Sequence, residues 1–201
     1  MAKYLWLSLL VALFGLSFFK NSVVARKAEL ASLINLEPLS RPEVIRQNSR
    51  EVIIVKVYST YPFNNRNLII VNAGFEDRVV EGMTVTADGN FLLGGVIGVS
   101  VRSSVVRTIF DKDFSLSVRI GEKEVDALLA GGQNPRLTLV EKTAEIKEGD
   151  LVFSVGGGFP YGLKIGQIGA INDRLVGSFK EAELQVPYML SDLREAAIFA
   201  K

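Results

Sequence analysis

From Glu51 onward the chain is divided into short apolar runs separated by turn residues, and this pattern most limits the folds available to it. Many runs are rich in Val and Ile and are bounded by Gly, Asn or Asp, as β-strands are. Asp88-Gly89 and Gly121-Glu122 have the composition of hairpin turns. No long helix separates the runs, so the pattern predicts a mainly β protein of antiparallel barrels or sandwiches. The expected strands are Val52–Tyr58, Leu68–Ala73, Met83–Ala87, Phe91–Val101, Val105–Phe110, Leu116–Ile120, Val125–Ala130, Arg136–Val140, Leu151–Val155, Leu163–Ile171, Ala182–Val186 and Ala196–Ala200.

The stretch Glu148–Gly169, EGDLVFSVGGGFPYGLKIGQIG, shows the pattern most clearly, with a turn, a strand, a run of glycines, a turn and a strand. A Walker phosphate loop requires Lys where this chain has Leu163. A dinucleotide loop requires Gly where it has Tyr161, and a helix afterwards. We therefore expect Gly156–Gly158 to form a corner with positive φ angles. Gly94-Gly95 is expected to mark a bulge or bend within its strand.

The N-terminal part contains an uncharged apolar run, Tyr4–Phe19, between Lys3 and Lys20. As a helix this run would span about 24 Å, slightly less than the ~30 Å hydrocarbon core, and flanking residues make up the difference. We expect residues 1–22 to form a cytoplasmic tip and a single transmembrane helix. The alternative is a cleaved signal peptide with Val23-x-Ala25 as a weak cleavage site. Basic residues flank both sides, so charge counting alone does not fix the orientation.

Residues 23–50 are expected to be a helical or coiled-coil linker. Ala25–Glu37 is rich in helix formers, Pro38 ends the helix, and Leu39–Arg50 is interpreted as a linker or a short second helix. One hypothesis is a short parallel coiled coil that pairs two chains, and the alternative is a polar linker helix that extends the membrane segment. The candidate pairing seam consists of Leu30, Leu33 and Ile34.

The chain contains neither His nor Cys, which excludes several kinds of chemistry. Ser-His-Asp and Cys-His catalysis cannot be assembled from its residues, and zinc sites with thiolate or imidazole ligands lack their ligands. A carboxylate metal site or a glycosidase-type acid pair remains open. Asp111 and Asp113 form the nearest carboxylate pair, and we expect them to be solvated turn acids. No catalytic residue, metal or cofactor is therefore expected.

The charge balance also limits the partners. The formal net charge is +1, from 23 basic and 22 acidic residues, which gives no long-range field for a polyanion, so we expect no nucleic-acid binding. The hydrophobic fraction of 48% agrees with the presence of a membrane segment.

The loop Phe159-Pro160-Tyr161 places two aromatic rings beside a proline. Because aromatic residues are enriched at the cores of protein interfaces, Phe159, Pro160 and Tyr161 form a candidate contact loop for a partner. The alternative is that both rings plug the open end of a β domain. Tyr61-Pro62-Phe63 repeats this composition in an earlier loop.

Several phrases of the sequence form a series with a characteristic order and spacing. They are Tyr61-Pro62-Phe63, Leu68–Gly74, Val80–Val85, Gly94–Val99, Val106–Asp111 with Leu116–Val118, and Gly149–Ser154 with Phe159–Gly166. In this order and spacing they resemble the phrases of the bacterial rod-shape-determining protein MreC family. The coiled-coil region is shorter than is usual in that family, and Arg78 stands where the family often has Gly.

The resemblance implies a definite architecture. It comprises an N-terminal transmembrane helix, a short helical or coiled-coil segment and two small antiparallel β-barrel domains of the six-stranded type. The second β domain is implied to be nested within the first. On this basis we expect residues 51–91 and 154–201 to form the first β domain, and residues 92–153 to form the second.

The resemblance also implies a function. It indicates a non-enzymatic scaffold of the cell-elongation machinery, anchored in the inner (plasma) membrane by a single pass, with its β domains outside the cytoplasm. The scaffold would organise peptidoglycan synthesis and maintain cell shape. The implied partners are a second copy, the actin-like cytoskeleton through its membrane partner, and the peptidoglycan transpeptidase and glycosyltransferase.

Two other classes of protein are alternatives to this scaffold. An adaptor subunit of an export system also combines a membrane helix with β domains, but normally needs a longer helical hairpin within its β part. An anchored hydrolase would need catalytic groups that the missing His and Cys do not supply.

Overall fold

The computed structural model describes residues 42–47, 50–59, 67–173 and 177–199. The expected transmembrane helix, the Leu30, Leu33 and Ile34 seam and the loop at residues 61–63 lie outside these ranges. The described residues form a 13-stranded sheet and one short 3-10 helix, η1 (Phe75–Asp77). This part of the chain contains no helix with the length and apolar character needed to cross a membrane.

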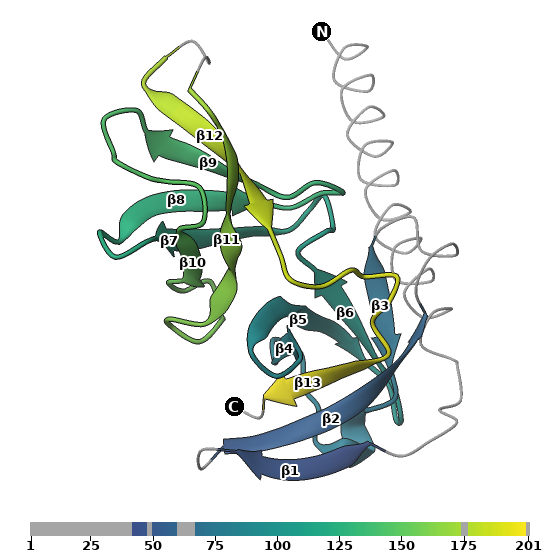
Figure 1. Cartoon of the computed structure of the whole chain (residues 1–201). Helices are drawn as coiled ribbons and strands as arrows, with labels where there is room; N and C mark the ends of the chain where they lie inside the picture. Colours follow the sequence, from purple (N-terminus) through teal and green to yellow (C-terminus); the bar gives the residue numbers. More distant parts are fainter. Residues whose placement is uncertain (1–41, 48–49, 60–66, 174–176, 200–201) are drawn as a thin grey trace, which may run out of the picture.

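Six strands form a closed barrel, seen in the lower part of Figure 1. The hydrogen-bonded order is β5-β4-β13-β2-β3-β6, and β6 pairs back with β5. All neighbours are antiparallel, and closure leaves these strands no free edge along the ring. The strands of this first barrel are β2 (Arg50–Ser59), β3 (Leu68–Val71), β4 (Thr84–Ala87), β5 (Phe91–Val99), β6 (Ser104–Thr108) and β13 (Glu195–Phe199).

Six further strands follow a pairing order that also returns to its start. The order is β10-β7-β8-β9-β12-β11, and β11 pairs with β10. These pairs are antiparallel as well. The strands of this second ring are β7 (Ser115–Ile120), β8 (Val125–Ala130), β9 (Arg136–Glu141), β10 (Leu151–Ser154), β11 (Lys164–Asn172) and β12 (Phe179–Gln185).

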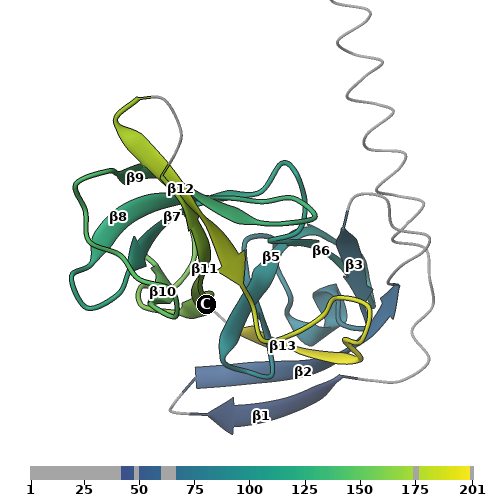
Figure 2. The same cartoon turned by 45° about the horizontal axis from the view of Figure 1, so that its top comes forward.

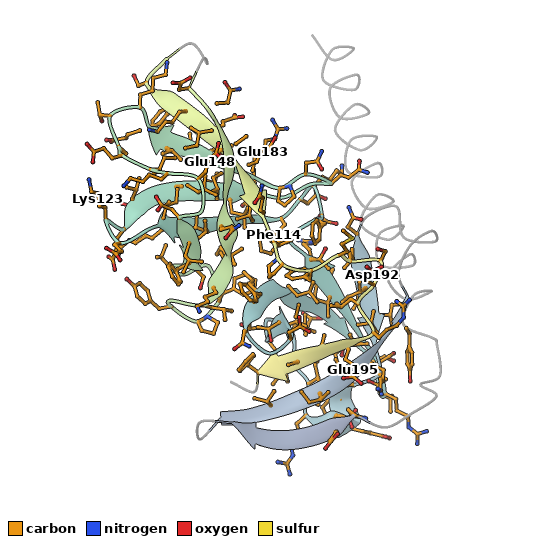
Figure 3. All side chains as sticks on the ribbon, in the orientation of Figure 1. Phe114, Lys123, Glu148, Glu183, Asp192 and Glu195 are labelled. Carbon is orange, nitrogen blue, oxygen red and sulfur yellow. The ribbon has the colours of Figure 1, made fainter. Side chains whose placement is uncertain are left out.

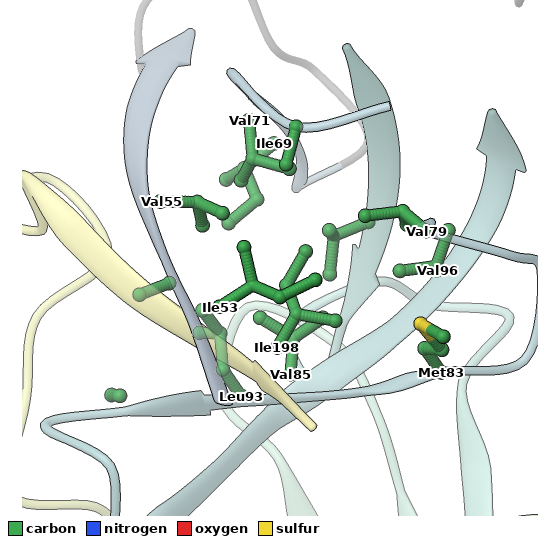
Figure 4. Packing of buried hydrophobic residues seen from close by; sticks show 14 of the residues in the cluster. Ile53, Val55, Ile69, Val71, Val79, Met83, Val85, Leu93, Val96 and Ile198 are labelled. Carbon is green, nitrogen blue, oxygen red and sulfur yellow. The ribbon is translucent and has the colours of Figure 1, made fainter. Parts of the chain in front are cut away.

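Each ring encloses its own apolar core. Figure 4 shows Ile53, Ile69, Val85 and Ile198 from four different strands meeting inside the first barrel. The second core is built in the same way, and on β7 exposed and buried side chains alternate along the strand. This period of two follows from the β pleat, and each fully buried Val, Leu or Ile contributes about 1.5–3 kcal/mol of transfer free energy.

Tyr188 joins the two cores. It lies in the segment between β12 and β13, which runs between the rings in Figure 2, and it packs against residues of both cores. Its hydroxyl group donates a hydrogen bond to the Leu92 carbonyl oxygen at 2.6 Å, and its ring meets Phe110 edge-on with centroids 6.1 Å apart. Burial raises the pKa of Tyr188 above its ordinary value, because the phenolate would lose its solvation. The rings also touch where β11 and β5 pair in parallel at Lys164 and Phe91.

A strand is present at each of the expected apolar runs, which confirms the mainly β prediction. The interpretation of Leu39–Arg50 as a linker or a helix is wrong where the structure describes it. Residues Glu43–Gln47 form strand β1, which pairs antiparallel with the first half of β2. Its sequence EVIRQ contains two β-branched residues, which favour a strand once β2 offers a partner.

The rings divide the chain at different places from those expected. β5 and β6 fall almost entirely within the expected second domain, residues 92–153, yet they pair within the first barrel. β11 and β12 fall within residues 154–201, yet they pair within the second ring. Asp88-Gly89 contributes to this difference, because its φ angles of 50° and 69° suit the tight hairpin that returns β5 onto β4.

Two residues of the first barrel have a backbone geometry that favours glycine, Gly94 and Arg78. A Cβ atom at Gly94 would lie 1.9 Å from the Arg107 carbonyl oxygen, so β5 and β6 approach closely only because Gly94 has no side chain. Register shifts occur on both sides of β5, as the Gly94-Gly95 pair predicts. Arg78, which follows η1, has a left-handed backbone with φ of 63°, where glycine is favoured.

Candidate functional site

The glycine corner and the loop after it are held by Ser154, at the end of β10. The Ser154 side chain is fully buried, and its hydroxyl group donates to the Pro160 carbonyl oxygen and accepts from the Leu163 backbone N–H at 3.2 Å. The Gly162 N–H donates to the Ser154 carbonyl oxygen at 2.9 Å. Gly156–Gly158 have φ angles of 152°, 67° and 90°, which confirms the predicted corner.

The two aromatic residues of this loop point to different surroundings. Phe159 is half-buried against the second core, with its ring centroid 5.9 Å from that of Phe114. It also reaches the first barrel, because a Cβ atom at Gly95 would lie 3.2 Å from its ring. Tyr161 is 67% exposed. Phe159 therefore has the packing role that the alternative interpretation gave to both rings, whereas Tyr161 remains available for contact.

Arg119 on β7 holds the hydroxyl end of Tyr161. Its Nη1 donates to the Tyr161 hydroxyl oxygen at 3.0 Å and to Glu124 Oε2 at 2.8 Å, while its Nε donates to Asp126 Oδ1 at 3.1 Å. The hydrogen bond to Asp126, followed by the Coulomb attraction of Tyr161, raises the pKa of Arg119 above its ordinary value. The four side chains form an exposed polar cluster in which Arg119 stays charged at any physiological pH.

Two adjoining depressions lie beside this cluster, and together we call them the Tyr161 hollow. Arg119, Glu124 and Tyr161 line the smaller one. One has a volume of about 520 Å³ and the other of about 260 Å³, and both are lined by Gly121, Glu122 and Phe153. The larger depression extends past Leu151 to Lys123 and Lys147, and the smaller one extends to Tyr161. At its far rim a hydrogen bond from Lys123, followed by that residue's positive charge, lowers the pKa of Glu145.

The structure gives the two members of the nearest carboxylate pair, Asp111 and Asp113, different surroundings. Asp113 is exposed, as expected, but Asp111 is only 3% exposed, so the expectation of a solvated acid is wrong for Asp111. Asp111 Oδ1 accepts the Asp113 backbone N–H at 2.8 Å and lies 3.9 Å from Arg107 Nε. It is a turn-forming residue, because the local hydrogen bond and the nearby cation compensate its burial. Among the described residues, no group of three or more His, Cys, Asp or Glu could hold a metal ion.

The sequence indicated the loop but not the residues that support it. Ser154 and Arg119 carry no motif, since a serine at a strand end and an arginine within a strand are both common. Their partners lie 5 to 42 positions away along the chain, so only the fold brings them together.

The chain is similar to proteins of one known family. The family described as Rod shape-determining protein MreC, barrel core, matches residues 57–200. The chain belongs to the MreC family. The Cell shape-determining protein MreC of Bacillus subtilis is 26% identical over 161 residues, which cover 73% of this chain and 56% of that protein. The chain thus spans about half the length of the curated relatives it matches, which have the same 56% coverage.

Solved MreC structures share the fold. The crystal structure of MreC from Pseudomonas aeruginosa superimposes with a TM-score of 0.64 and 26% identity, and covers 73% of this chain and 97% of that one. A complex between the penicillin-binding protein PBP2 and MreC from Helicobacter pylori gives a TM-score of 0.57 at 17% identity, covering 73% of this chain and 96% of that one. The second likeness concerns the fold alone.

Proposed function

We propose that this chain is a non-enzymatic, membrane-anchored scaffold of the rod-shape machinery, which helps to organise peptidoglycan synthesis. Its membership of the MreC family, with a match that covers nearly all of the described strands, carries the proposal. The chain would act by position, with residues 1–22 as the anchor in the plasma membrane and the β part outside the cytoplasm. The actin-like cytoskeleton, through its membrane partner, and a peptidoglycan glycosyltransferase are proposed as further members of the assembly.

A peptidoglycan transpeptidase is the partner with the most direct support. The relative from Helicobacter pylori forms a complex with the penicillin-binding protein PBP2. We expect the full chain, solubilised from membranes of its own cells, to co-purify with the elongation-specific penicillin-binding protein. If the cytoskeletal partners co-purify with the chain and no penicillin-binding protein does, the transpeptidase assignment is contradicted.

The anchor has its own test. The mass of the chain isolated from membranes distinguishes a retained transmembrane helix from a signal peptide removed near Ala25. Retention of Met1–Lys3 in an alkali-resistant membrane fraction is expected. A mature chain that begins after Ala25 would exclude the anchor.

Self-association through residues 23–50 is proposed on the basis of the Leu30, Leu33 and Ile34 seam. A two-heptad seam is marginal in water, so support from the membrane helix is part of the proposal. Sedimentation of the full chain in detergent, beside a variant with all three residues changed to Glu, tests it. Equal monomeric mass for both would contradict pairing through this seam.

We also propose that the two rings are two domains and that the second is an insertion in the first. The second ring uses one continuous stretch of chain, whereas β13 returns to the first barrel only after it. The separate apolar cores support this division, because each ring has its own buried residues.

A further inference from the structure

The Tyr161 hollow is a concave, partly apolar surface on the second ring. It runs from Tyr161 past Phe153 to Leu151, over the end of β7 and over β10. Leu151 is 40% exposed and Tyr161 is 67% exposed, so apolar atoms face solvent at both ends. An apolar surface inside a polar rim is also the arrangement found at protein interaction sites.

The Tyr161 side chain is fixed before any partner arrives. Arg119 holds its hydroxyl group, and Arg119 is itself bound by Glu124 and Asp126. Below the loop, Ser154 fixes both the Pro160 carbonyl oxygen and the Leu163 N–H. A partner therefore loses little free energy in ordering this aromatic ring, which is the condition for an interface anchor.

The rim of the hollow is acidic. Four carboxylates line it, and a fifth, Glu148, stands in the sequence between the lining residues Lys147 and Gly149. Three cations, Arg119, Lys123 and Lys147, oppose these five carboxylates, which leaves a formal charge of −2. Arg119 is paired with Glu124 and Lys123 with Glu145, so Glu122, Glu148 and Asp150 face only one further cation, Lys147. Lys123 lies at the outer edge of the second ring in Figure 3. The five carboxylates belong to Glu122, Glu124, Glu145, Glu148 and Asp150.

We propose that the Tyr161 hollow binds an extended segment of a partner protein that carries Lys or Arg on both sides of an apolar side chain. The apolar side chain would rest on Leu151 and Phe153. A basic side chain would lie against the exposed ring of Tyr161, where a cation–π contact adds to the attraction of the rim. An anionic lipid surface or a nucleic acid would be repelled by the same carboxylates.

The test is a binding measurement on the full 201-residue chain in zwitterionic micelles. The probe is an acetylated, fluorescein-labelled peptide, Lys-Ala-Lys-Leu-Lys-Ala-Lys, and empty micelles provide the blank. A matched peptide with Glu at every Lys position tests the role of charge. We expect the lysine peptide alone to bind, and its affinity to fall as salt is added.

Three variants locate the site. Tyr161→Ala is expected to weaken binding of the lysine peptide about tenfold. The double change Glu122→Lys with Glu148→Lys is expected to weaken the lysine peptide and to allow the glutamate peptide to bind. Phe179→Ala is the matched control, because Phe179 is a similarly exposed aromatic residue on β12 outside the hollow, and it is expected to leave binding unchanged.

Equal binding of the lysine peptide to the parent chain and to Tyr161→Ala would overturn the proposal, and so would equal binding of both peptides to the parent. Concentration-dependent dimerisation that is lost in Tyr161→Ala would assign the surface to a second copy instead, and would also overturn it. The proposal is independent of the transpeptidase assignment, because co-purification with a penicillin-binding protein can succeed or fail separately from this measurement.

Discussion

Gly94 has no room for a side chain, because a Cβ atom there would lie 1.9 Å from the Arg107 carbonyl oxygen. The obstacle is backbone, which cannot move without opening the β5–β6 pair. We expect Gly94→Ala to destabilise the chain by roughly 3 kcal/mol or more, at the upper end of the cost of overpacking. Thermal unfolding followed by circular dichroism measures this loss.

The neighbouring Gly95 is the control for this change. A Cβ atom at Gly95 would be crowded by the Phe159 ring, at 3.2 Å, and would meet the Met83 carbonyl oxygen at an ordinary contact distance of 3.7 Å. A side chain such as Phe159 can shift where a backbone cannot. Gly95→Ala is therefore expected to cost about 1 kcal/mol or less. A larger loss for Gly95→Ala than for Gly94→Ala would show that close strand approach is not the cause.

Arg78 gives a prediction of the opposite sign. Its φ of 63° places an L-residue in the left-handed region, at a cost of about 1–2 kcal/mol that glycine avoids. We expect Arg78→Gly to stabilise the chain by roughly 0.5–1 kcal/mol, because the flexibility that glycine adds to the unfolded state offsets part of the gain. Chemical denaturation measures this change in the free energy of unfolding. Glu81→Gly is the control, because Glu81 lies nearby and has no positive φ, so this change should not stabilise the chain.

At the scale of the elements, the segment between β12 and β13 holds the two rings together through Tyr188. The folded-state pKa of Tyr188 lies above the unfolded value of about 10, so its contribution to stability is complete below that pH. Above it, the unfolded chain releases a proton that the folded chain keeps. We expect stability to fall there by up to about 1.4 kcal/mol per pH unit from this group.

Replacing Tyr188 with Phe should remove this contribution to the fall in the free energy of unfolding at alkaline pH. It should also cost about 1 kcal/mol at neutral pH, because the Leu92 carbonyl oxygen loses its hydrogen bond. Urea unfolding between neutral and alkaline pH compares the slopes, with Tyr161→Phe as the control that leaves Tyr188 in place. Parallel slopes for the parent and Tyr188→Phe would contradict the assignment.

The strands themselves could be predicted from sequence because each is a short run of Val, Ile and Leu bounded by turn residues. β1 was missed because its five residues acquire strand geometry only from pairing with β2. The assignment of β5 and β6 failed for a related reason, since strand partners are chosen by contacts distant in sequence that no local pattern records. Tyr161 could be predicted as a contact residue from the aromatic composition of its loop. Arg119, which donates a hydrogen bond to it, could not, because the two residues are 42 positions apart.

At the scale of the whole molecule, the second ring is continuous in sequence and the first barrel is not. If the rings are separate domains, residues 109–187 should fold alone, whereas residues 42–108, which lack β13, should not. Dispersed amide signals and a cooperative thermal transition are expected only for the first fragment. An unfolded 109–187 fragment would show that the second ring depends on the first barrel.

The late position of β13 has a consequence for the way the chain is made. β13 lies between β2 and β4, so until residues 195–199 emerge both of those strands present an unpaired edge. During synthesis from the N-terminus, all strands of the second ring are available before that gap can close. The open edges, which favour aggregation, therefore persist for as long as it takes to produce the inserted stretch. A ribosome that stalls within that stretch leaves the first barrel with five of its six strands and no closing strand.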